Sequence, residues 1–108
     1  MPPGGRLSAV AYSNVAPSPS FEMLAVTIVT YDVPNIWVVD LKNGRPSGQL
    51  RQLTHEAEGA SFPDWSPDGR WVSYQCAADD GDTNVCAIQL DGTGRKQAAG
   101  PRPAGNGG

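Results

Sequence analysis

The stretch that decides the fold is residues 62–74, which read Phe62-Pro63-Asp64-Trp65-Ser66-Pro67-Asp68-Gly69-Arg70-Trp71-Val72-Ser73-Tyr74. Its centre, Ser66-Pro67-Asp68-Gly69, predicts a tight turn, because proline presets φ, aspartate bonds its own backbone and glycine accepts a positive φ. The turn would join a strand that ends at Trp65 to a strand that begins at Arg70. Trp65 is then a candidate packing anchor between neighbouring sheets.

Apolar runs with a period of two continue along the rest of the chain. They occupy residues 23–31, 36–41, 71–76 and 85–90, and turn residues such as Val33-Pro34-Asn35, Asn43-Gly44 and Asp91-Gly92 separate them. Short strands at this spacing predict an all-β fold. The 108 residues include 13 Gly and 10 Pro, which excludes a helix bundle. No apolar run of about 18 residues is present, so we expect no membrane-spanning helix.

The sequence also contains an internal repeat. Ser18-Pro19 recurs as Ser66-Pro67, and Asn35 before an apolar strand recurs as Asn84. If each half forms an antiparallel hairpin, one register places apolar residues opposite each other in both halves. The predicted pairs are Leu24–Leu41, Val26–Val39 and Ile28–Trp37, and then Val72–Leu90, Tyr74–Ile88 and Cys76–Cys86. The expected hairpin loops are residues 31–34 and 79–83.

Residues 62–74 resemble the P-x-W-S-P-D-G-[KR]-x-[IV]-x-[FY] core of the TolB-like (WD40-like, PD40-type) β-propeller repeat. The strand and turn at 84–95, the strand at 35–40 and Arg51-Gln52-Leu53-Thr54 are also similar to that repeat. The resemblance covers about residues 18–97. It is poor at 18–22, where Ser-Pro-Ser-Phe-Glu replaces Ser-Pro-Asp-Gly-Lys, and no Leu-Thr pair follows Arg95-Lys96-Gln97. The repeat signature is Trp65, Ser66, Pro67, Asp68 and Gly69.

The resemblance implies about two four-stranded antiparallel blades of a TolB-like β-propeller in an incomplete ring. We expect a loose N-terminal segment at 1–8, a first degenerate repeat at 9–65, a second repeat at 66–97 with its signature starting at 62, and a disordered Pro/Gly tail at 98–108. A propeller needs at least four blades. We therefore expect a truncated or degenerate piece of a longer repeat protein, or an obligate oligomer.

Cys76 and Cys86 are the only cysteines in the chain. The predicted register places them directly opposite each other, close enough for a disulfide with some local tightening. A disulfide would staple the base of an acidic loop and would indicate an oxidising compartment. The alternatives are two reduced, buried packing residues or a pair of metal ligands, and the chain offers no Cys/His set for the latter.

Other candidate sites have a structural explanation. Asp80, Asp82, Asn84 and Asp91 have the spacing of a calcium loop, but Val85 stands where that loop requires glycine. His55 is the sole histidine and has no G-x-S-x-G partner motif, so we interpret it as a surface residue. Nucleotide-binding motifs are absent. We interpret Trp37 and Trp65 as core residues and Trp71 as packed on the opposite face, with a carbohydrate platform as the alternative. We expect no catalytic, cofactor-binding or metal-binding residues.

These observations and the resemblance predict a non-catalytic interaction module of a TolB-like cell-envelope protein. The alternatives are the propeller portion of a prolyl-oligopeptidase-like serine peptidase and a two-blade, self-assembling, lectin-like unit. The resemblance implies protein partners. The formal net charge is −3, with the acidic excess in residues 55–108 and no basic stripe, so we expect no nucleic acid. No signal peptide is visible, and a periplasmic or extracellular location is expected only if the parent protein is exported.

Overall fold

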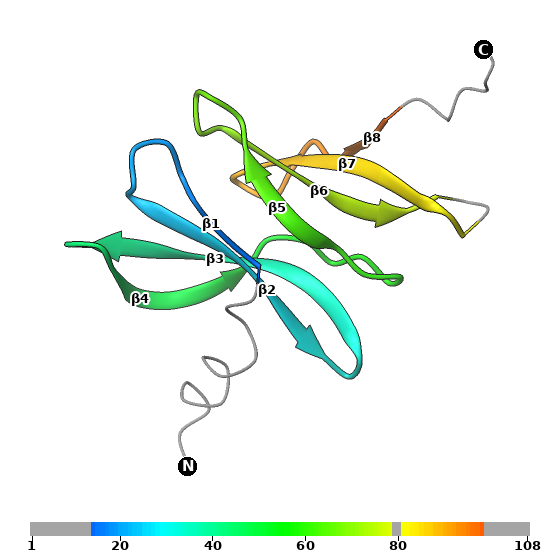
Figure 1. The fold of residues 1–108 in the computed structure, drawn as a ribbon, viewed down its shortest axis with the longest axis horizontal. Helices are drawn as coiled ribbons and strands as arrows, with labels where there is room; N and C mark the ends of the chain where they lie inside the picture. The colour runs from blue at the N-terminus through cyan, green and yellow to red at the C-terminus, as the bar shows by residue number, and fades with distance from the viewer. Residues whose placement is uncertain (1–13, 79–80, 99–108) are drawn as a thin grey trace.

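The computed structural model describes residues 14–78 and 81–98. These residues form eight β-strands in two four-stranded antiparallel sheets, each a simple meander (Figure 1). The expected loose segment 1–8 and the tail 98–108, apart from Ala98, lie outside the described residues. The described part of the chain holds no helix that could cross a membrane. Its two sheets do not close a ring, so the predicted all-β pair of blades is confirmed.

The first sheet comprises β1 (Val15–Pro17), β2 (Met23–Thr30), β3 (Val33–Lys42) and β4 (Arg45–Gln52). The second sheet comprises β5 (Ser61–Trp65), β6 (Trp71–Ala77), β7 (Thr83–Gln89) and β8 (Lys96–Gln97). The sheets therefore divide the chain between Gln52 and Ser61, whereas the sequence repeat was divided between Trp65 and Ser66. The difference is β5, which precedes the signature turn and pairs with β6.

The two sheets stack through β5, which crosses the first sheet and contacts β1, β2 and β3 (Figure 1). Apolar residues of both sheets and of the segment between them form one core in this interface: Ala25, Ile36, Val38, Leu53, Ala60, Val72, Tyr74, Cys76, Cys86 and Ile88. A second cluster lies on the other face of the first sheet, where Val26 and Ile28 pack with Leu24, Trp37 and Leu50. Each sheet thus has two different faces, as the alternation of residues along a strand requires.

The predicted hairpin registers are wrong by two residues in both sheets. Leu24 lies opposite Val39, not Leu41. Tyr74 lies opposite Cys86, not Ile88. A shift of two preserves the side to which each residue points, because side chains alternate with a period of two. The equivalence of the two repeats and the expected faces therefore hold, while the individual pairs do not.

The tight turn of the first hairpin explains this shift. Thr30 pairs with Val33, so only Tyr31 and Asp32 lie between the strands. Their φ values are 51° and 66°, as a two-residue type I′ turn requires. Such turns favour Asn and Gly, so Tyr31-Asp32 is a weak sequence signal for one. The expected turn at Val33-Pro34 is in fact the start of β3. In the second hairpin, Ala77 pairs with Thr83, so Thr83 is also in a strand.

The segment between the sheets is fixed by Asn35. The Thr54 hydroxyl donates to Asn35 Oδ1 at 2.7 Å, and the Glu56 backbone N–H donates to the same oxygen at 2.9 Å. The Asn35 amide donates in turn to the Glu56 carbonyl at 3.2 Å. Ala60 N–H donates to the Pro34 carbonyl at 2.8 Å. These bonds hold residues 54–60 against the start of β3 and so position Glu56 between the two sheets.

Candidate functional site

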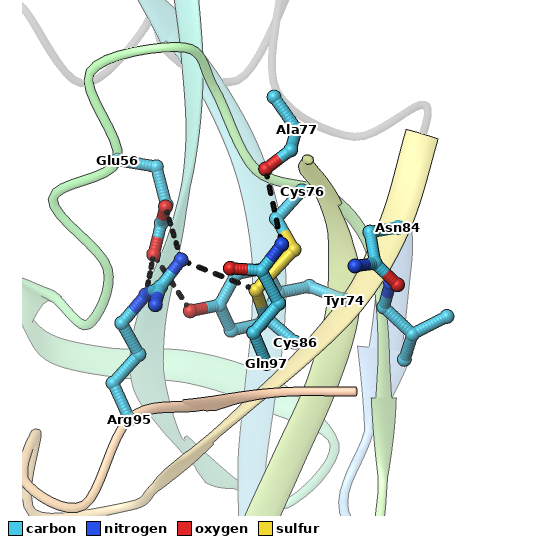
Figure 2. Close-up of a disulfide and its surroundings, with 9 residues drawn as sticks. Glu56, Tyr74, Cys76, Ala77, Asn84, Cys86, Arg95 and Gln97 are labelled. Carbon is cyan, nitrogen blue, oxygen red and sulfur yellow. Dashed lines mark hydrogen bonds and ion pairs between the residues drawn. A yellow bond between two sulfur atoms is a disulfide. The ribbon is translucent and has the colours of Figure 1, made fainter. Parts of the chain in front are cut away.

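The most chemically distinctive group of residues surrounds a disulfide between Cys76 and Cys86 (Figure 2). The sequence predicts that the two cysteines lie directly opposite each other, and this is wrong. Cys76 lies opposite Asn84, and the disulfide joins diagonal positions of the β6–β7 hairpin with a Cα–Cα distance of 5.9 Å. This distance is ordinary for a disulfide. Both residues are almost completely buried, at 4% exposed for Cys76 and 1% for Cys86.

Beside the disulfide, Glu56 holds two partners. Arg95 donates from Nε to Glu56 Oε2 at 2.6 Å and from Nη2 to Oε1 at 3.1 Å. The Tyr74 hydroxyl donates to Glu56 Oε2 at 2.9 Å. Figure 2 shows these side chains converging from the inter-sheet segment, β6 and the loop before β8. The sequence does not predict this cluster, since Glu56 and Arg95 are 39 residues apart and no pattern links them.

The contacts change the acid–base properties of the group. The hydrogen bonds from Arg95, and more weakly the one from Tyr74, lower the pKa of Glu56 in spite of its partial burial. Burial, together with the negative charge of Glu56, raises the pKa of the Tyr74 hydroxyl. Glu56 is therefore a carboxylate with a bidentate arginine partner, and Tyr74 is a hydroxyl that donates.

Arg95 also reaches the disulfide. Its Nη2 lies 3.3 Å from Cys86 Sγ, and the guanidinium spans the space between the carboxylate and the sulfur (Figure 2). On the other side, Cys76 borders a hollow of about 230 Å³ whose lining includes Glu58, Ser61, Gln75 and Asp82. The two cysteines thus have different surroundings: a guanidinium lies beside Cys86 Sγ, and Cys76 is one of the residues that line an acidic hollow.

The repeat signature has a structural role in the turn before β6. Ser66 Oγ–H donates to Asp68 Oδ1 at 2.6 Å and accepts from the Trp71 N–H at 3.0 Å. The Ser66 hydroxyl is therefore occupied by turn contacts, and within the described residues its hydrogen bonds involve no histidine. Trp65 lies between the sheets, where its Nε1–H donates to the Ala16 carbonyl at 2.7 Å.

The remaining sequence candidates are dispersed. Trp37 packs on the far face of the first sheet. Trp71 lies half-buried on the outer face of the second sheet, beneath Lys96, whose Nζ is 4.5 Å from its ring centroid. His55 is exposed in the inter-sheet segment. Across residues 14–78 and 81–98, no three His, Cys, Asp or Glu residues gather as metal ligands would. Asp80, one member of the weighed calcium loop, lies outside the described residues.

Comparison with solved structures defines the class of fold as that of a β-propeller. The structure of putative TolB from Agrobacterium tumefaciens superposes with a TM-score of 0.66 at 24% identity, over 78% of this chain and 28% of that one. TolB from Acinetobacter baumannii gives a TM-score of 0.58 at 20% identity, over 81% of this chain and 21% of that one. The chain therefore has a TolB-like fold and spans less than a third of the length of these structures.

Neither of the other two comparisons adds to this result. No protein-family model matches the chain. No curated protein matches it either.

Proposed function

We propose that this chain is a non-catalytic interaction module of a TolB-like β-propeller protein of the cell envelope. The TolB-like fold supports the class of protein. The Cys76–Cys86 disulfide supports an oxidising location, periplasmic or extracellular, because disulfides persist there and are rare in the cytosol. The partner that we propose is a protein that packs a β-sheet against the outer face of the second sheet.

The observation that carries the proposal is a difference between equivalent positions of the two sheets. Ile36 in β3 is 0% exposed, because the second sheet covers it. Val85, its equivalent in β7, is 52% exposed on the face that points away from the first sheet. The second sheet therefore presents outward the face that the first sheet buries against a neighbour. A face with equivalent residues is suited to bind a further sheet, and an exposed large aliphatic residue is typical of a surface that binds another protein.

Neighbouring residues on this face fit the same interpretation. Ser73 and Ala87 lie opposite each other at its centre. Their equivalents in the first sheet, Ala25 and Val38, are buried in the interface, and all four side chains are small or short. Small residues at the centre of a sheet face allow a second sheet to approach closely, at about 10 Å. The outer face thus has the shape that a stacked sheet requires.

Site-specific photocrosslinking in cells that export the protein tests this proposal. A photoreactive residue at Val85 should give a discrete protein adduct, whereas the same residue at Val29, which is 45% exposed on the first sheet, should not. An adduct with twice the mass of the chain would identify a second copy as the partner. Equal adducts from both positions, or none from Val85, would contradict the proposal.

A further inference from the structure

We propose that the Cys76–Cys86 disulfide is a directional thiol-exchange site, at which an uncharged or cationic dithiol attacks Cys76 and Arg95 receives Cys86 as the leaving thiolate. This inference concerns the edge of the core between the sheets and does not depend on the proposed partner of the outer face. It rests on the different surroundings of the two sulfur atoms.

The first argument is the position of the arginine. Arg95 Nη2 carries two hydrogens, of which one serves Glu56 Oε1 at 3.1 Å and the other points to Cys86 Sγ at 3.3 Å. A neutral disulfide sulfur is a weak acceptor, but a thiolate in its place would make a charge-assisted hydrogen bond. The guanidinium is thus already positioned for the negative charge that exchange would place on Cys86.

Cys76 also differs from Cys86 in its place beside a hollow. Cys76 is one of the residues that line the hollow of about 230 Å³, and Cys86 is not. Glu58 lines the same hollow. A carboxylate in this lining disfavours an anionic reagent and favours an incoming thiol without negative charge. The hollow beside Cys76 and the guanidinium beside Cys86 therefore favour the same direction of exchange, with Cys76 attacked and Cys86 released.

The exchange takes place in two steps, an attack on Cys76 and then closure of the reagent's own disulfide. The thiolate of a small dithiol forms a bond to Cys76 Sγ, the Cys76–Cys86 bond breaks, and its electron pair moves to Cys86 Sγ beside Arg95. The second thiol of the reagent loses its proton to water and attacks the reagent's own bridging sulfur. Cys76 leaves as a thiolate and takes up a proton. The reagent is oxidised to its disulfide, and both cysteines are reduced. The rate depends on which sulfur is attacked and on the stability of the leaving thiolate.

The direct test is to trap the mixed disulfide on the full chain. Reaction with a monothiol, cysteamine, followed by acid quenching and peptide fragmentation, locates the adduct. We expect it on Cys76, with Cys86 free, and we expect the anionic thiol mercaptoacetate to react more slowly at equal thiolate concentration. An adduct on Cys86, or equal adducts on both cysteines, would overturn the proposal.

Two substitutions separate a role of Arg95 in the chemistry from a role in stability. Arg95→Gln should slow reduction by dithiothreitol about tenfold, the effect on a rate of losing one charge-assisted hydrogen bond. Glu56→Gln should accelerate reduction, since it removes the competing carboxylate. Arg51→Gln is the matched control, because Arg51 donates a hydrogen bond of 2.8 Å to the Leu90 carbonyl and has no bond to either sulfur. This substitution should leave the rate of reduction unchanged. If loosened packing alone controlled reduction, Arg95→Gln and Glu56→Gln would both accelerate it, and that result would refute the proposal.

Discussion

The turns that precede β2 and β6 share their backbone hydrogen bonds and one serine bond but have different sequences. Ser18 Oγ accepts from the Met23 N–H at 3.2 Å, and Ser66 Oγ accepts from the Trp71 N–H at 3.0 Å. The fourth residue of each turn has a positive φ, 60° at Phe21 and 75° at Gly69. The serine, the proline that follows it and the flanking strands are common to the two turns, whereas the glycine is not. The glycine of the repeat signature lowers the conformational cost of the turn without determining its shape.

The two sheets extend this comparison. In each, equivalent strands pair in equivalent registers, but the first sheet is covered by the second and the second is open on its outer face. The second hairpin has a disulfide where the first has Ile28 and Trp37 at the equivalent positions. The same backbone thus tolerates different means of stabilisation, and substitutions at equivalent positions measure how far the two sheets differ.

The largest difference is expected at Ile36 and Val85. Ile36→Ala should lower the free energy of unfolding by about 3 kcal/mol, because it removes a fully buried side chain from the core between the sheets. Val85→Ala should change it by less than about 0.5 kcal/mol, because the side chain is half-exposed. Urea unfolding monitored by circular dichroism measures both. Equal losses would show that the outer face is covered in the isolated chain.

The next effect is that of the disulfide. Replacement of Cys76 and Cys86 together by alanine should lower the free energy of unfolding by about 2.5 kcal/mol, since the bond closes a loop across a sequence separation of 10. The variant should show no further loss on addition of a reductant, whereas the native chain should. Thiol titration before and after reduction provides the control. A native chain with two free thiols in non-reducing buffer would contradict the structure.

Smaller effects on the free energy of unfolding are expected in the two turns, and they have opposite signs for the two substitutions. Phe21→Gly should raise the free energy of unfolding by about 1 kcal/mol, because the phenylalanine has a left-handed backbone and is 68% exposed. Gly69→Ala should lower it by about 1 kcal/mol for the same reason, and the added Cβ would meet only Pro19 at 3.9 Å. Thermal unfolding of both variants tests the pair. Destabilisation by Phe21→Gly would show that the aromatic ring has a packing role.

The smallest effect concerns pH. Because Arg95 lowers the pKa of Glu56 in the folded state, this carboxylate contributes stability above its ordinary pKa of about 4.3, and the contribution is lost as the pH falls through the lower folded value. Glu56→Gln should remove this part of the acid dependence, at a scale of about 1 kcal/mol or less for a partly exposed pair. Unfolding curves at pH values on either side of the ordinary pKa give the measurement. Parallel pH profiles for the native chain and Glu56→Gln would contradict this assignment.

The sequence was sufficient for the apolar strands β2, β3, β6 and β7, for the repeat and for the faces, because these depend on local alternation and on turn residues such as Ser66-Pro67-Asp68-Gly69. It did not locate β1, β4 and β8, which are short or mostly polar. It was not sufficient for the register, since Tyr31 and Asp32 form their turn without the Asn or Gly that usually indicates one. A register that differs by two residues buries the same side chains. The hydrophobic pattern therefore could not distinguish the two arrangements.

The candidate site divides in the same way. The cysteine pair was predictable, because the two residues belong to neighbouring strands and share a face. The Glu56–Arg95 pair was not, because both residues lie outside the strands and meet only when the two sheets stack. The segment between the sheets contains two acidic residues, Glu56 and Glu58, so the sequence does not indicate which of them pairs with Arg95. The bonds from Asn35 hold the Glu56 backbone, and the Tyr74 hydroxyl holds its carboxylate beside Arg95.

The bond from Trp65 to Ala16 also has a consequence for the order of folding. Each sheet is a meander of neighbouring strands, whose contacts close short stretches of chain. The Trp65 indole bonds to a residue 49 positions away, in the other sheet. Because contacts between distant residues close at a greater entropic cost, docking of the sheets should be the slow and late step. The indole at this contact is also a fluorophore, one of three tryptophans in the chain, and its emission should change when the sheets dock.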